Sequence, residues 1–256
     1  MATTHALRFA DGLVTKTYAS WHRGEHQREW AVLCRLHLHA GGLAPEPVRV
    51  RLDTMPPAVT MTLVPGEPLR GRPGGAELEG LAAALRTLWS VPLGGAPPLD
   101  DWADDLHFAR RLVDTPWPGA RNEIAEALAA ATRWWQGPDP DLLRERPSTL
   151  ILGHRDPNLA NYLWDGQRIR VVDFEDARAS DPATELALFA EHLSTRDLDL
   201  DRLLSCFTVD ERRLLAARRM WAMFWLLLLR PGGAADRRNP TDTARRQALR
   251  LLDLLH

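Results

Sequence analysis

Two short polar segments in the second half of the chain contain residue types that could hold a metal ion and accept a proton. The segments are 154-HRDPNLAN-161 and 171-VVDFED-176. An Asp-Gly pair halfway between them predicts a tight turn, and therefore a hairpin. We expect Asn161 and Asp173 to lie at the same end of this hairpin, with Asp156 in the loop that leads into it.

These side chains indicate a particular chemistry. A carboxylate and an amide oxygen that lie close together suit Mg²⁺, which keeps several of its waters and also binds phosphate oxygens. A further carboxylate that does not bind the metal can accept a proton from an attacking hydroxyl group. A metal, nucleotide phosphates and a base are the parts that phosphoryl transfer requires.

The chain also has a single lysine, Lys16, and 31 arginines. Lysine is a compact point charge on a flexible stem, whereas arginine is a broad planar fork. The one lysine therefore indicates a position at which a small, mobile charge is needed.

The elements that position these residues divide the chain in two. Residues 6–19 read as a hairpin around Asp11-Gly12, a helix runs from Glu25 to about His39, and two further strands follow. Those strands span residues 47–52 and 58–64. Helices are expected at 76–90, 100–114, 119–136, 183–193, 199–205, 209–229 and 241–255, with one β element at 161–172.

This pattern predicts an α+β fold with a small antiparallel β-sheet lobe, which includes one helix, and a larger, mainly helical lobe. The boundaries that we expect are 1–64 for the first lobe, 65–75 for a proline- and glycine-rich hinge and connector, and 76–256 for the second lobe.

Composition excludes several classes of function. The chain has 256 residues, 45% of them hydrophobic, and a net charge of −2, so no basic face is expected to bind nucleic acid or an anionic membrane. The apolar run 221–229 is too short to cross a bilayer, and the first twelve residues do not resemble a signal peptide. Cys34 and Cys206 lack metal-ligand spacing, so we expect a cytoplasmic protein; composition leaves the oligomeric state open.

The two polar segments resemble the catalytic loop and metal-binding segment of the aminoglycoside phosphotransferase and choline kinase-like family, relatives of the protein kinases. The shared pattern is H-x-D-x-x-x-x-N, a hairpin, and an apolar strand that ends in Asp. The resemblance implies that Asp156 is the catalytic base, that Asn161 and Asp173 bind Mg²⁺, and that His154 supports the loop.

The resemblance extends to other parts of the chain. It includes 181-DPATELA-187, where Asp181 opens a helix, and it includes 27-QREWAVLCRL-36 and 61-MTLVPGEPL-69. In this family Lys16 would contact the α/β-phosphates of ATP or GTP, with a glutamate on the first helix as its partner. Glu29 fits this place, and Glu25 is the alternative. The backbone of Thr62, Leu63 and Val64 would contact the purine.

Two departures from the pattern shape the prediction. Only fifteen residues precede Lys16, and their one glycine, Gly12, lies in the hairpin turn, so the glycine-rich phosphate loop of kinase folds is missing. Only seven residues separate Asp173 from Asp181, and no A-P-E sequence follows. Because that leaves no platform for a polypeptide, we expect a small hydroxylated acceptor.

Some acidic residues remain ambiguous. Glu175 and Asp176 could extend the metal site, line the substrate pocket or cap the next segment. Asp101 and Asp105 belong to an acidic run that reads as a solvated helix start, or as part of a site for a cationic substrate.

The sequence thus predicts an ATP- or GTP- and Mg²⁺-dependent kinase of a small molecule. The acceptor would be an aminoglycoside-like or other cationic natural product, with a choline or sugar alcohol as an alternative. A kinase-like protein that binds a ligand without catalysis is the rival prediction.

Overall fold

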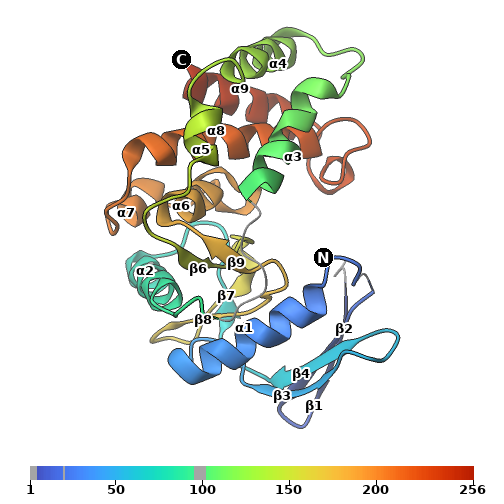
Figure 1. Ribbon diagram of the computed structural model, residues 1–256, viewed down its shortest axis with the longest axis vertical. Coiled ribbons are helices and arrows are strands. Elements are labelled where there is room, and N and C mark those ends of the chain that lie inside the picture. The colour runs from blue at the N-terminus through green and yellow to red at the C-terminus, as the bar shows by residue number, and fades with distance from the viewer. Residues whose placement is uncertain (1–4, 20, 95–101) are drawn as a thin grey trace.

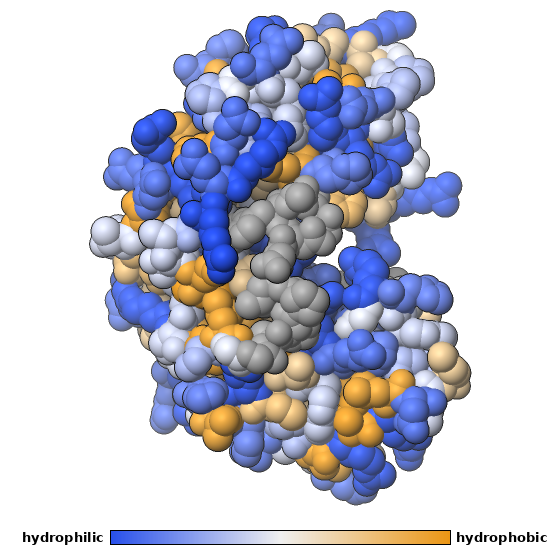
Figure 2. Space-filling view, viewed as in Figure 1, coloured by the Kyte–Doolittle hydropathy of each residue, from blue (hydrophilic) through white to orange (hydrophobic). Residues whose placement is uncertain are grey.

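The computed structural model describes residues 5–19, 21–94 and 102–256. A four-stranded sheet with one long helix against it forms the lower part of the molecule, and a group of helices forms the upper part (Figure 1). Short strands lie between the two, and the surface is notched between the lower and upper parts (Figure 2). The predicted α+β class and two-lobe arrangement are confirmed.

The N-terminal sheet is antiparallel throughout, with the strand order β1-β2-β4-β3. Its strands are β1 (Ala6–Ala10), β2 (Leu13–Thr17), β3 (Pro47–Arg51) and β4 (Ala58–Thr62). At the turn between β1 and β2, Asp11 and Gly12 have φ angles of 51° and 73°. Two positive φ angles are what an Asp-Gly hairpin turn requires, so β1 and β2 pair directly with no longer loop between them.

Helix α1 (Glu25–His39) lies against this sheet. Its buried apolar side chains Val32, Leu33 and Leu36 recur at the spacing of one helix face, and they pack with Val59 of β4. The same face carries a buried glutamate, Glu29. A buried carboxylate on an otherwise apolar face needs a partner, and the partner comes from β2.

Two small sheets join the lobes. β5 (Glu67–Pro68) pairs with β7 (Tyr162–Trp164), which pairs with β8 (Ile169–Val171), and β6 (Ile151–Gly153) pairs with β9 (Arg178–Ser180). The sequence predicted only the β7–β8 hairpin here. The expectation of a single β element in this region is wrong, because strands of two or three residues are too short to show any alternation of apolar and polar side chains.

Helices make up most of the second lobe. They are α2 (Gly75–Trp89), α3 (Trp102–Asp114), α4 (Asn122–Trp134), α5 (Asp139–Arg144), α6 (Pro182–Glu191), α7 (Leu200–Leu204), α8 (Glu211–Leu228) and α9 (Thr243–Leu255). All except α5 were expected, with ends that differ by a few residues. Single 3-10 turns are η1 (Leu159–Asn161), η2 (Leu193–Thr195) and η3 (Asp236–Arg238).

The apolar interior has two parts. One cluster runs from Leu33 of α1 and Val59 of β4 into α2 and the central strands, where Leu85, Tyr162 and Phe174 are fully buried. A second cluster joins α3, α4, α8 and α9 with one side of α6. The first cluster therefore continues past residue 64, the end of the first lobe expected from the sequence.

None of the helices in the described ranges combines the length and the apolar character that crossing a membrane requires.

Candidate active site

Lys16 lies on β2 and its ammonium group is buried between the lobes. Nζ donates a hydrogen bond to Glu29 Oε2 over 2.8 Å, so the predicted ion pair between β2 and α1 is present. Glu25, the alternative partner, instead accepts from Arg23 Nε at 2.9 Å. Exposure of the Lys16 and Glu29 side chains is 8% and 1%.

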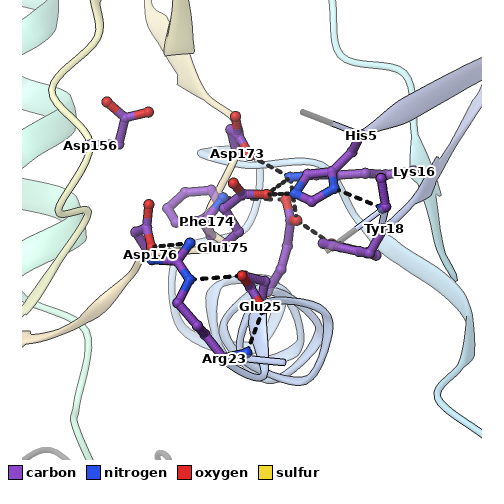
Figure 3. Close-up of polar contacts among 12 residues, drawn as sticks. His5, Lys16, Tyr18, Arg23, Glu25, Asp156, Asp173, Phe174, Glu175 and Asp176 are labelled. Atoms are coloured by element: carbon purple, nitrogen blue, oxygen red, sulfur yellow. Dashed lines mark hydrogen bonds and ion pairs between the residues drawn. The ribbon is translucent and has the colours of Figure 1, made fainter. Parts of the chain in front are cut away.

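Two more carboxylates reach Lys16 from the segment after β8, and the group is shown in Figure 3. Lys16 donates to Asp173 Oδ1 and lies 2.7 Å from Glu175 Oε2. Burial opposes the charge on Lys16, but the carboxylates outweigh it and hold the pKa of Lys16 above its ordinary value. Burial raises the pKa of Glu175 to about 7, because Lys16 offsets only part of that effect and Asp173 adds to it.

Glu29 connects α1 to both of the other segments. Besides Lys16, it accepts a hydrogen bond from the Tyr18 hydroxyl and one from the Phe174 N–H, the latter over 3.2 Å. Glu175 Oε2 in turn lies 2.8 Å from Nε2 of His5, the residue just before β1. Residues far apart in the sequence thus meet at one charged centre, which ties the two lobes together.

The acidic groups around Lys16 are chemically suited to a cation. One oxygen each from Glu29, Asp173 and Glu175 lies within 4.8 Å of the others. Of the two metal ligands that the sequence predicted, Asp173 belongs to this group of carboxylates. Asn161 has an amide side chain and is described next. Carboxylate oxygens of this kind are ligands for Mg²⁺.

Asn161 lies at the end of the β7–β8 hairpin that also carries Asp173. The Val172 N–H donates to the Asn161 carbonyl over 3.0 Å, which places the two side chains at the same end of the hairpin, as expected. Asn161 Nδ2 donates to Asp156 Oδ2 over 2.9 Å. In the described part of the chain no donor bonds to Asn161 Oδ1, so this hard oxygen suits a metal ion.

His154 is buried beneath the loop that carries Asp156. Its Nδ1 accepts the Asp156 N–H over 3.3 Å, so Nε2 carries the proton and donates to the Val172 carbonyl over 2.9 Å. The imidazole ring also packs against Tyr162 and Phe174. One side chain thereby connects the loop to the strand that leads to Asp173, which is the support that the resemblance implies.

Asp156 is separate from the Lys16 group, as Figure 3 shows, and its side chain is 34% exposed. Oδ1 accepts the Asn158 N–H over 3.1 Å and lies 4.0 Å from His192 Nε2, while Oδ2 accepts from Asn161. Both oxygens are therefore held in place, yet the carboxylate still reaches solvent. A carboxylate that is oriented and accessible can accept a proton from a bound hydroxyl group.

Two residues of the site have strained backbones. Arg155, next to Asp156, and Asp173 have φ angles of 68° and 69°, in the left-handed region that residues other than glycine rarely adopt. Such conformations cost on the order of 1–3 kcal/mol and persist where the surroundings impose them. At Arg155 the constraint is visible, because Glu185 Oε2 accepts the N–H groups of His154 and Arg155 over 3.0 and 3.4 Å.

The acidic residues that the sequence left ambiguous serve different purposes. Asp105 is buried and pairs with Arg155 and, at 3.5 Å, with Arg178, so the expectation of a solvated helix start is wrong for it. It is also occupied by arginines rather than free to hold a cationic substrate. Asp176 is partly exposed and lies 3.8 Å from Arg23, whereas Asp101 is outside the described residues.

Asp181 begins α6, as the sequence predicted. Its side chain accepts the Thr184 N–H over 3.0 Å and the Thr184 hydroxyl over 2.7 Å, which caps the helix. Arg213 of α8 lies 3.1 Å from the same carboxylate. The cap is thus part of a buried ion pair that joins α6 to α8.

The backbone of residues 62–64 is less free than expected. The Thr62 N–H donates to Glu46 and the Leu63 N–H donates to Gly12, both within the N-terminal lobe. The Val64 N–H has no partner in the described part of the chain. Of the three backbone N–H groups in this segment, only that of Val64 is left available to a purine; the prediction named the backbone as a whole, carbonyl groups included.

Several residues of the site gave no sequence signal. Glu185 read only as part of the DPATELA segment, although it supports the strained loop. Tyr18, His5 and His192 are single polar residues in ordinary surroundings, and only the fold brings them to Glu29, Glu175 and Asp156. A buried carboxylate such as Glu185 on a strongly apolar helix is the one signal that could have been used, because such a group needs a partner.

Comparison with known proteins identifies relatives of the chain. A family model described as "Phosphotransferase enzyme family" matches residues 13–221. Among curated proteins, none matches the sequence significantly.

Solved structures share the fold at low sequence identity. A choline/ethanolamine kinase family protein from Mesorhizobium loti has a TM-score of 0.69 and 19% identity, over 100% of this chain and 86% of that protein. The GDP complex of aminoglycoside 2'-phosphotransferase-IIIa has a TM-score of 0.65 and 18% identity, over 100% and 89%. A thermostable mutant of aminoglycoside phosphotransferase APH(4)-Ia, in a ternary complex with AMP-PNP and hygromycin B, has a TM-score of 0.65 and 14% identity, over 98% and 92%.

Proposed function

The chain belongs to the phosphotransferase enzyme family, and we propose that it transfers the γ-phosphoryl group of ATP or GTP to a hydroxyl group of a small molecule. One observation carries this proposal. Lys16 is buried and held by Glu29 and Asp173, and the β7–β8 hairpin joins the segment of Asp173 to the loop that carries the accessible, oriented Asp156.

The nucleotide would bind on the face of the N-terminal sheet that carries Lys16. Cross-strand pairs in an antiparallel sheet share a face, so Leu7, opposite Lys16, and Phe9, opposite Val14, lie on this face too. Both are exposed, which suits an apolar cover for a purine. Lys16 would hold the α/β-phosphates, and the Val64 N–H would donate to the base. Similar structures bind GDP and AMP-PNP, which supports a nucleotide without deciding between ATP and GTP.

Asn161 and Asp173 would hold Mg²⁺. The ion would neutralise charge on the nucleotide phosphates and keep them oriented for transfer. Asp173 now pairs with Lys16, and Glu175 lies within reach of the same ammonium. Glu175 can therefore keep Lys16 paired when Asp173 turns to a cation.

Asp156 would accept the proton of the acceptor hydroxyl as its oxygen attacks the γ-phosphorus. The hydrogen bonds from Asn158 and Asn161 fix the carboxylate, and its exposed fraction lets an alcohol approach. A positioned general base contributes about 10²–10⁴-fold to a rate.

The acceptor that we propose is an aminoglycoside-like or choline-like alcohol. Similar structures include a choline/ethanolamine kinase family protein and an aminoglycoside phosphotransferase with hygromycin B. The short connection from Asp173 to Asp181, which contains only β9, supports a small acceptor over a polypeptide.

The proposal is tested by incubation with labelled ATP, MgCl₂ and a panel of choline, ethanolamine, a sugar alcohol, kanamycin and hygromycin B. Wild type should label at least one acceptor, and Asp156→Asn should lower the transfer rate by about 10²–10⁴-fold with an unchanged melting temperature. Asp141→Asn, a substitution of a carboxylate that is 81% exposed, serves as the matched control. Equal transfer by wild type and Asp156→Asn would refute the role of Asp156.

A specific feature favours a second candidate, a protein that binds a nucleotide without catalysis. β1 and β2 are joined by a two-residue turn, so these two strands, the first in the described part of the chain, carry no glycine-rich loop between them to cover the phosphates. A ligand bound by the native state raises the melting temperature, so ATP with Mg²⁺ should stabilise an enzyme and a binding protein alike. Stabilisation by ATP without transfer to any acceptor, and without ATP hydrolysis, would favour the second candidate.

A further inference from the structure

His192 lies directly after α6, and its Nε2 lies 4.0 Å from the carboxylate of Asp156. Its side chain is 11% exposed, and its ring meets the Trp225 ring edge-on, with centroids 4.7 Å apart. A histidine in such surroundings could simply fill space. Its hydrogen bonds indicate a more specific arrangement.

Ser194 determines which ring nitrogen carries the proton. The Ser194 N–H donates to His192 Nδ1 over 3.1 Å, and the Ser194 hydroxyl lies 2.7 Å from the same nitrogen. Because Ser194 Oγ accepts the Leu159 N–H over 3.1 Å, the proton of the hydroxyl is free to point at Nδ1. With Nδ1 an acceptor, the neutral ring carries its proton on Nε2.

Burial keeps the ring neutral. It lowers the pKa of His192 to about 4, although Asp156 opposes this change and Arg196 adds to it. His192 at neutral pH is therefore a fixed N–H donor, and it does not compete with Asp156 for a proton.

This N–H faces Asp156 across a gap. Nε2 and Asp156 Oδ1 are 4.0 Å apart, beyond the roughly 2.7–3.2 Å of a direct hydrogen bond. A polar contact at this separation is commonly completed by an oxygen between the two groups. A single hydroxyl oxygen can lie at hydrogen-bond distance from both atoms, accepting from Nε2–H and donating to Oδ1.

We propose that His192 is a catalytic residue of the acceptor site, where Nε2–H and Asp156 Oδ1 together hold the hydroxyl group that is to be phosphorylated. The inference rests on the proposed phosphotransferase function and adds a substrate-binding residue to it. It also requires an acceptor whose reacting group is an alcohol, because the oxygen must accept one hydrogen bond and donate another.

The step balances with the groups present. The acceptor oxygen uses one lone pair for the His192 N–H and the other for the γ-phosphorus. As the new O–P bond forms, the bond from phosphorus to the bridging oxygen breaks and its electrons leave with the nucleoside diphosphate. The hydroxyl proton passes to Asp156 Oδ1, while His192 keeps its own proton.

The first test compares His192→Phe with His192→Gln. Phe keeps a ring against Trp225 but has no donor, whereas the Gln amide restores an N–H near the position of Nε2. With MgATP and whichever of choline, ethanolamine, kanamycin or hygromycin B wild type phosphorylates, His192→Phe should lower kcat/KM for that acceptor by about 10²-fold. The KM for ATP should stay unchanged, and His192→Gln should recover at least tenfold of the loss.

A packing role would give a different result. The inference would be overturned if kcat/KM for the acceptor and the KM for ATP both became worse, or if both variants had a lowered melting temperature. Equal activity of His192→Phe and His192→Gln would overturn it as well. His39→Phe, a substitution of an exposed histidine at the end of α1, is the matched control and should match wild type.

A second test does not depend on activity. A crystal structure of the wild-type protein should contain a water or alcohol oxygen within about 3.2 Å of both His192 Nε2 and Asp156 Oδ1. Direct contact between these two atoms, or an apolar group between them, would overturn the inference. If this oxygen is present but no transfer occurs, the proposed function fails, while the binding of an oxygen by His192 and Asp156 stands. If transfer occurs at the same rate without His192, the proposed function stands and the role of His192 fails.

Discussion

Lys16 and Arg155 are both buried cations surrounded by carboxylates, yet their surroundings differ in access to water. Lys16 meets Glu29, Asp173 and Glu175, whose side chains are 1%, 39% and 15% exposed. Arg155 meets Asp105 and Glu185, which are 8% and 2% exposed. The Lys16 group opens to solvent through Asp173, whereas both carboxylates of the Arg155 group are almost fully buried.

The difference explains what each group can do. A carboxylate at an open edge can exchange a lysine partner for a phosphate-bound cation, so the Lys16 group suits a ligand. Separating a fully buried ion pair costs a large free energy, because the charge that remains is poorly hydrated. The Arg155 group instead supports the loop beside Asp156, where Glu185 accepts the backbone N–H groups of His154 and Arg155.

The strongest test of this comparison removes each cation in turn. Arg155→Met should lower the free energy of unfolding by about 3–5 kcal/mol, because Asp105 and Glu185 stay buried without it. Lys16→Met should cost less, because Asp173 can hydrate and Glu29 keeps its bonds from Tyr18 and Phe174. Urea denaturation at pH 8 measures both values.

Arg144→Met is the control for loss of a cation, since Arg144 is 56% exposed and its pair with Asp141 should contribute no more than about 1 kcal/mol. A larger loss for Lys16→Met than for Arg155→Met would contradict the distinction between an open and a sealed group.

The two centres should also respond to pH with opposite sign. With its pKa raised to about 7, Glu175 holds a proton in the folded protein that the unfolded chain releases near pH 4.5, so stability falls as pH rises through this window. His192 has its pKa lowered to about 4 from 6.5, so only the unfolded chain is protonated between these values, and stability falls as pH decreases. Each effect reaches at most about 3 kcal/mol.

Urea denaturation between pH 4.5 and 8, with EDTA present, separates the two. The stability of Glu175→Gln relative to wild type should increase with pH, and that of His192→Gln should decrease. Slopes of the same sign in both variants would show that one of the two groups does not titrate as its burial implies.

A smaller effect is expected at Glu185, which connects the sealed group to the loop. In Glu185→Gln the side chain can still accept one backbone N–H, but the charge that strengthens its bonds to His154 and Arg155 is lost. We expect a loss of about 1–2 kcal/mol in unfolding free energy. Transfer should slow on the order of tenfold, because Asp156 moves with the loop.

Steady-state kinetics with ATP as the varied substrate check this prediction. The KM for ATP should not change, since Glu185 does not contact the Lys16 group. A change confined to the KM for ATP would show that Glu185 acts on the Lys16 group and not on the loop of Asp156.

The smallest effect concerns the Asp11-Gly12 turn between β1 and β2, the strand that carries Lys16. Gly12→Ala places a side chain at φ +73°, where nothing lies within 4 Å of the new Cβ, so only the backbone is strained. The cost should be about 1 kcal/mol, visible as a small drop in melting temperature. Gly94→Ala, also without contacts and without a positive φ, is the control. No difference between the two variants would argue against the Asp-Gly turn.

Local features of the fold could be predicted from the sequence. The β1–β2 hairpin follows from Asp11-Gly12, the long helices follow from their apolar periodicity, and Asp181 is recognisable as a helix cap. The ion pair between Lys16 and Glu29 was predictable only through the family resemblance, which left Glu25 as the alternative partner.

Contacts between distant segments could not be predicted in the same way. β6 and β9 are three residues long and lie 25 positions apart, so neither shows a strand pattern. Asp105 looks like a helix-start carboxylate until the fold brings Arg155 to it. His192 gave no signal, and the sequence left the role of Glu175 open, because its partners His5 and Lys16 come from the other end of the chain.

The division of the apolar interior has a consequence for motion. Because one core joins the N-terminal sheet to α2, β7 and β8, the sheet face that carries Lys16 should move as one rigid body with Asp173 and with the loop that carries Asp156. The layer of α3, α4, α8 and α9 forms the other body, and α6 contributes to both. Any opening that admits an acceptor should therefore bend near α6, and leave the alignment of base and phosphate undisturbed.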